Sequence, residues 1–124
     1  MMLDTERKIL ASGIDLGFKE GEHLYRAGQS ADYVFYLKDG KIALINDHNK
    51  DQPIVLKNAR CFVGLEEFIS EEPHHYSVKI LENAEMLVFE RSMMLLLMEE
   101  YPLAKRYLML KMCDYLAAKD KVFE

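Results

Sequence analysis

The side chains best suited to chemistry are four histidines: His23, His48, His74 and His75. A metal site built from histidine needs imidazoles that converge on one ion, but adjacent residues of a strand point to opposite faces. His74 and His75 therefore do not share an ion, and the other two lie in separate turns. One of the adjacent pair could face a cleft and donate to an anionic or polar ligand. The alternative is that both are loop residues without a role, and in either case we expect no metal.

The sequence offers no activated nucleophile. Ser12, Ser70 and Ser77 have no neighbouring base in a recognisable elbow. Cys61 and Cys113 are widely spaced and form no CxxC pair, in a chain without a secretory signal. This usage predicts reduced thiols rather than a disulfide or a zinc site. We therefore expect a non-enzymatic protein with no catalytic residues and no cofactor.

Length and charge restrict the possible partners. The chain has 124 residues, enough for one domain, with 16 basic and 21 acidic residues and a net charge of −5. Nucleic-acid binders concentrate Lys and Arg, so we expect no direct nucleic-acid binding by this segment. No apolar run approaches the ~18 residues that span a bilayer. We expect a cytoplasmic protein that does not enter membranes.

Short strands and turns dominate from about residue 18 to about residue 90. The predicted strands are His23–Arg26, Asp32–Lys38, Lys41–Ile45, Ile54–Leu56, His75–Leu81 and Glu85–Phe89. Asp39-Gly40 between two such runs predicts a hairpin, because a tight primed turn needs positive φ. Glu82-Asn83-Ala84 predicts another turn. Many short strands with regular turns favour a β-roll or sandwich.

Helical patterns flank this region. Residues 4–11 predict a short helix capped by Asp4 or Thr5, and Ser12-Gly13 ends it. From about residue 92 to about residue 121 two more helices are expected. Ser92 caps the first, Met93–Tyr101, and Pro102 suits the first turn of the second.

The last helix has a wider apolar arc than one packing face requires. One stripe at helical spacing contains Leu103, Tyr107, Leu110, Cys113 and Ala117; a second contains Leu108, Met109, Met112 and Leu116. The simpler interpretation is that the whole arc packs on the strands. The functional interpretation is that one stripe covers the strands while the other meets the same helix of a second chain. We take the first stripe as the candidate homodimer contact.

A spaced set of glycines and apolar residues runs from Leu24 to Gly40. Its members are Leu24, Gly28, Gln29, Ala31, the run Val34-Phe35-Tyr36-Leu37 and Gly40. Together they resemble the first signature of the cyclic nucleotide-binding domain family, which includes catabolite-activator-type bacterial regulators. Tyr25 departs from the pattern, where an aliphatic residue or Cys is usual. The resemblance implies a mainly β fold over residues 1–124: a double-stranded β-helix (jelly roll or β-roll) with a short N-terminal helix and two C-terminal helices.

A second segment resembles the family's phosphate cassette in part. That cassette reads aliphatic-Gly-Glu-x-small-aliphatic and later Arg; its Glu takes a ribose hydroxyl and its Arg pairs with the cyclic phosphate. Here Val63-Gly64 matches, but Leu65 stands in the place of the Glu. His74 falls in the place of the Arg, or His75 in a register shifted by one residue. The candidate cleft residues are Val63, Gly64, Leu65, Glu66, Glu67, His74, His75 and Tyr76.

A buried phosphodiester needs a fixed cationic donor, and neither register supplies an arginine. Glu66 and Glu67 also bring negative charge toward an anionic ligand. The sequence therefore predicts a regulatory or sensor module with lost or altered cyclic nucleotide affinity, which signals through its C-terminal helices. Two alternatives remain: a structural dimerisation module with an empty cleft, or the effector half of a transcription regulator whose DNA-binding domain is absent from this chain. A metal-dependent cupin is a weaker alternative because no HxH pair exists.

Overall fold

Two long antiparallel strands organise the β-roll. The computed structural model describes residues 2–111. In it, β3 and β6 pair from Tyr33↔Glu90 to Ile45↔Ser77. β1 and β2 pair with β6, while β4 and β5 pair with β3. The strands are β1 (Ile14–Phe18), β2 (His23–Tyr25), β3 (Tyr33–Ile45), β4 (Ile54–Lys57), β5 (Cys61–Val63) and β6 (Ser77–Glu90).

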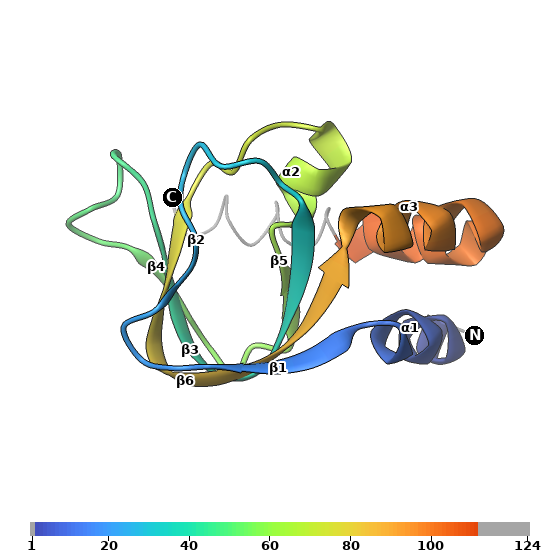
Figure 1. The fold of residues 1–124 in the computed structure, drawn as a ribbon, viewed down its shortest axis with the longest axis horizontal. Helices are drawn as coiled ribbons and strands as arrows, with labels where there is room; N and C mark the ends of the chain where they lie inside the picture. The colour runs from blue at the N-terminus through green and yellow to red at the C-terminus, as the bar shows by residue number, and fades with distance from the viewer. Residues whose placement is uncertain (1, 112–124) are drawn as a thin grey trace.

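Helices lie at one end of the roll and between two of its strands. α1 (Met2–Ala11) and α3 (Arg91–Glu100) lie at the same end, and α2 (Leu65–Ser70) connects β5 to the loop before β6 (Figure 1). Residues 102–111 form a further helix, which begins at Pro102 as expected. The mainly β fold with flanking helices is therefore confirmed. None of the helices within residues 2–111 is long and apolar enough to cross a membrane.

The two faces of β3 enter different hydrophobic cores. Phe35 and Leu37 point into the roll, together with Val78, Ile80 and other residues of β6. Successive side chains of a strand alternate between faces, so Val34 and Tyr36 point the other way. They enter a second core beneath the helices, which also contains Ile9, Phe62, Leu65, Phe89, Met94, Ala104, Tyr107 and Leu108. One strand thus ties the roll to the helices.

The predicted hairpin at Asp39-Gly40 is wrong, because β3 continues through it. The pairing with β6 shifts register between Leu37 and Ile42, which marks a β-bulge. Gly40 has φ 111°, and its N–H donates to Oδ1 of Asn58 at 2.8 Å. The expected positive φ is found at Gly40 but not at Asp39, and a bulge requires that conformation of its glycine as much as a turn does.

Two further expectations about local structure are corrected, and one strand was missed. The predicted turn at Glu82-Asn83-Ala84 is wrong, because β6 is continuous from Ser77 to Glu90. β1 was not predicted, since its side chains are mostly exposed and the pairing that forms it is with the distant β6. Ser92 is not the cap of α3, because the helix begins at Arg91. The hydroxyl of Ser92 instead donates to Oε1 of Glu90 at 2.8 Å.

We predict that Gly40→Ala lowers the free energy of unfolding by roughly 2–4 kcal/mol, from positive φ and overpacking together. A Cβ at this position would lie 2.5 Å from Cα of Ala84, a backbone atom that cannot move aside cheaply. Urea unfolding is the measurement. Gly17→Ala is the matched control, because nothing lies within 4 Å of its added Cβ. Equal stability of the two variants would contradict the tight approach of β3 to β6.

Candidate functional site

Gly64 joins β5 to α2 and lies directly against the ring of His74. It adopts φ 83° as the residue before the helix, a conformation that favours glycine. A Cβ at Gly64 would lie 3.1 Å from Cε1 of His74. Two local features therefore favour glycine at this position of the cassette, namely the backbone conformation and the close imidazole.

His74 points into the protein. Its side chain is 2% exposed, and its ring stacks on Tyr25 with centroids 3.5 Å apart and an interplanar angle of 13°. Its backbone is also bound, because its N–H donates to the carbonyl of Gln29 at 2.9 Å and its carbonyl accepts from Gly28 at 2.8 Å. His75 is different: its side chain is 37% exposed, and its Nε2 lies 3.4 Å from Oε2 of Glu72.

A buried carboxylate holds both histidines in place. Oε1 of Glu67 lies 3.2 Å from Nδ1 of His74 and accepts a hydrogen bond from the backbone N–H of His75 at 3.1 Å. Burial by itself would raise the pKa of Glu67, but the hydrogen bonds from His74 and from backbone N–H groups outweigh it and hold this pKa below its ordinary value. Glu67 is therefore a charged group satisfied from within the chain.

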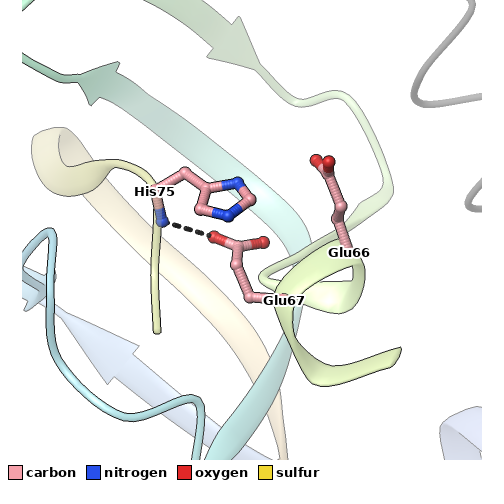
Figure 2. Close-up of side chains that lie close together, drawn as sticks. All are labelled: Glu66, Glu67 and His75. Carbon is pink, nitrogen blue, oxygen red and sulfur yellow. Dashed lines mark hydrogen bonds between the residues drawn. The ribbon is translucent and has the colours of Figure 1, made fainter. Parts of the chain in front are cut away.

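Glu66, Glu67 and His75 form a small cluster (Figure 2). Each offers one ligand atom, and these atoms lie within 4.8 Å of one another. Carboxylate and imidazole together suit divalent transition metals, so these are the described residues that could hold one. However, Glu67 is already engaged by His74, and His75 contacts Glu72. Ion binding would require His75 to exchange that contact for the metal.

The structure separates the other candidate residues of the cassette. Val63 and Tyr76 are buried in the core of the roll, whereas Leu65 is buried in the second core, beneath the helices. Leu65, in the place of the family's Glu, therefore contributes packing. The short helix α2 was not predicted, because it has only six residues and no side-chain cap.

Two residues that contact the cassette were missed from the sequence. Tyr25 was noted only as a departure from the first signature, and its stacking on His74 explains that departure. Arg91 stacks on the ring of Phe68 in α2, with its guanidinium carbon 5.3 Å from the ring centroid. Arg91 also donates to the carbonyl of Ala31 at 3.1 Å. No local pattern marks either contact, since each joins segments far apart in the chain.

Comparison with known proteins agrees with this architecture. The family model described as "Cyclic nucleotide-binding domain" matches residues 16–101. The chain therefore belongs to the cyclic nucleotide-binding domain family. A sequence search of curated proteins found no significant match.

Two solved structures have the same fold. The chain is similar to the catabolite activator protein of Thermus thermophilus with a TM-score of 0.78 and 19% identity, over 97% of this chain and 57% of that one. It is also similar to the N-terminal domain of a transcriptional regulator from Streptomyces coelicolor A3(2), with a TM-score of 0.72 and 14% identity, over 96% of this chain and 84% of that one. The chain thus spans little more than half the length of the Thermus protein, and likeness at these identities shows the fold alone.

We predict that Glu67→Gln destabilises the protein by about 1–2 kcal/mol at pH 7, because it removes a charged acceptor of buried hydrogen bonds. The pKa of Glu67 is lowered in the folded state, so its stabilisation is present above the ordinary carboxyl pKa and is lost as pH falls through the folded value. The difference between wild type and variant should therefore shrink toward pH 3. Urea unfolding at several pH values is the measurement.

Glu72→Gln is the control for this experiment. Its carboxylate contacts His75 at the surface, with 56% of the side chain exposed, so we expect a change below about 0.5 kcal/mol. A difference between wild type and Glu67→Gln that stays constant from pH 7 to pH 3 would contradict the role given to the Glu67 charge.

Proposed function

We propose that this chain is a non-enzymatic regulatory module, acting in the cytoplasm, whose cassette does not bind cyclic nucleotides in the family's usual manner. The observation that carries the proposal is the buried pair of Glu67 and His74. In the family's pattern an arginine at this position pairs with the cyclic phosphate. Here the group in that place is an imidazole that already contacts a carboxylate of its own chain.

Electrostatics supports the same conclusion. A cyclic phosphate beside this imidazole would approach the charged Glu67 carboxylate. Two like charges 4 Å apart repel by about 4 kcal/mol at an effective dielectric constant of 20. Tyr25 adds a steric obstacle, because its ring covers one face of the imidazole. Binding would therefore require the loss of the pair, the stack or both.

We further propose that the C-terminal helices carry the output, through a shift between two packings. Ala104, Tyr107 and Leu108 are buried against the second core, so the helix over residues 102–111 is packed on the rest of the chain. Tyr107 is only 2% exposed and cannot be part of an exposed dimer face, which corrects its place in the predicted stripe. Cys113 and Ala117 lie outside the described residues.

The remaining members of that stripe favour a homodimer. Leu103 is 61% exposed and Leu110 is 49% exposed. They lie on the opposite side of the helix from the buried residues. α3 also exposes Met93, Leu95 and Leu96. Apolar side chains gathered on neighbouring helices are typical of a protein contact. The same face supports the alternative of a purely structural module, in which the satisfied cassette binds nothing.

A second candidate role is the effector part of a transcription regulator. The likeness to the N-terminal domain of the Streptomyces regulator, of which 84% is covered, favours this role. In that case the helix over residues 102–111 would pass the response on to a DNA-binding domain. The full-length gene sequence distinguishes this role from a free-standing module.

We predict that cyclic AMP and cyclic GMP at 1 mM shift the melting temperature by less than ~1 °C. A ligand present at 100 times its Kd stabilises by about 2.7 kcal/mol, which amounts to several degrees for a domain of this size. Differential scanning fluorimetry is the measurement, with a family member that carries an intact cassette as the positive control. A clear shift at micromolar cyclic AMP would overturn the proposal of lost affinity.

We also predict that the double substitution of Leu103→Lys and Leu110→Lys converts a dimer into a monomer. Desolvating two new charges at an apolar contact is strongly unfavourable. Sedimentation equilibrium should then give the chain mass of 14.5 kDa instead of twice that value. Ile14→Lys with Leu16→Lys is the control, because both side chains are exposed but belong to β1 and not to the C-terminal helices. A wild-type chain that is monomeric at 50 μM would contradict the dimer.

A further inference from the structure

A cavity of about 270 Å³ lies between the start of the cassette and the helices. β5 and the first turn of α2 form one side of it, and α1 and the helix over residues 102–111 form the other. Aromatic rings dominate its walls. Tyr36 and Phe62 meet edge to face with centroids 5.1 Å apart, and Tyr107 meets Phe62 in the same way at 6.4 Å. This aromatic part of the wall suits a small hydrophobic group.

The hydroxyl of Tyr107 is the unusual feature of this wall. The residue is 2% exposed, and its oxygen has no hydrogen-bond partner within residues 2–111. Burial raises the pKa of this hydroxyl, and the neighbouring Glu6 carboxylate and Tyr36 raise it further. A buried polar group without a partner is rare, and each one calls for an explanation, such as an ordered water or a bound group. Tyr107 thus offers a neutral hydroxyl at a cavity that also contains a carboxylate.

Charges of both signs surround the cavity. Its acidic lining residues are Glu6, Glu66 and Glu67, and its basic ones are the exposed Arg60 and Lys111. Glu67 already contacts His74, whereas Glu6 lies beside Tyr107 at the far end from the cassette. The ammonium group of Lys111 lies 5.6 Å from the centroid of the Tyr107 ring. Within the part of the chain that the structure describes, neither Arg60 nor Lys111 forms an ion pair with an acidic group. A ligand with a single charge would match one of these signs and be repelled by the other.

We propose that this cavity binds a small zwitterionic amino acid with an apolar or aromatic side chain. Its ammonium group lies between the Glu6 carboxylate and the hydroxyl oxygen of Tyr107. Its carboxylate lies toward Arg60 and Lys111, and its side chain packs on Phe62 and the neighbouring ring. The inference rests on the proposed function in one respect: this ligand would supply the signal to the last helix. That helix contributes Tyr107 to the cavity.

The test uses the full chain with Cys113→Ser, so that Cys61 is the single thiol. Cys61 lines the cavity, and burial raises its pKa to about 11, so it reacts slowly with iodoacetamide. L-phenylalanine is the probe. We expect it at millimolar concentration to slow alkylation of Cys61 at least threefold at pH 8.5, as followed by mass spectrometry. Phenethylamine and 3-phenylpropionate, which each lack one of the two charged groups, should protect less.

Tyr107→Phe tests the role of the hydroxyl. This variant keeps the ring and removes the unpartnered group, so its melting temperature without ligand should be unchanged or higher. Its affinity for L-phenylalanine should fall roughly tenfold, the effect of losing one hydrogen bond to a charged group. Tyr101→Phe is the control, since Tyr101 is 46% exposed and does not line this cavity. It should retain full protection of Cys61.

Three other outcomes would each overturn part of the proposal. Absence of protection by L-phenylalanine, or equal protection in Tyr107→Phe, would mean that the hydroxyl meets only an ordered water and would overturn the site. Equal protection by 3-phenylpropionate would overturn the zwitterion. A micromolar response to cyclic AMP would instead overturn the proposed function and leave protection of Cys61 by the amino acid unaffected, so the two failures are distinguishable.

Discussion

The pairing of a buried carboxylate with a buried imidazole determines the rest of the cassette. Glu67 lies on α2 and His74 lies in the loop before β6, so their contact closes that loop onto the helix. The closed loop then places the imidazole against Gly64 and the ring of Tyr25. Breaking one partner of such a pair leaves the other charged or polar group buried alone, which is strongly unfavourable. The pair therefore maintains a closed arrangement that ordinary ligand binding would have to disrupt.

Two departures from the family's pattern become one feature in three dimensions. Tyr25 departs from the first signature and His74 from the second, yet their rings stack face to face. Each residue taken alone is only a mismatch to the family's pattern. Together they fill the space beside the cassette glycine with a packed aromatic pair. The family's fold is retained, while the position of the family's arginine is taken by an imidazole that is satisfied within the chain.

The fold could be predicted from the sequence because its determinants are local. Gly28 and Gly40 both adopt positive φ. Glycines with this role can be recognised from their spacing relative to the apolar residues of the strands. The element at Asp39-Gly40 was misassigned because positive φ serves a bulge as well as a turn. The site was less predictable. The missing arginine could be recognised, but the contact of His74 with Tyr25 joins distant segments, and α2 is too short to produce a helical pattern.

The bulge at Gly40 also changes the phase of its strand. Before the bulge the odd-numbered residues Phe35 and Leu37 enter the roll; after it the even-numbered Ile42 and Leu44 do so. On β6 the inward residues keep even numbers throughout, as at Val78 and Met86. From the pair Leu37↔Met86 to the pair Ile42↔Ile80, β3 advances by five residues and β6 by six, and this odd spacing inverts the parity of the inward side chains on β3. A change of one residue in length between Leu37 and Ile42 would displace Ile42 and Leu44 from their present partners on β6, so the length of this segment is as constrained as its composition.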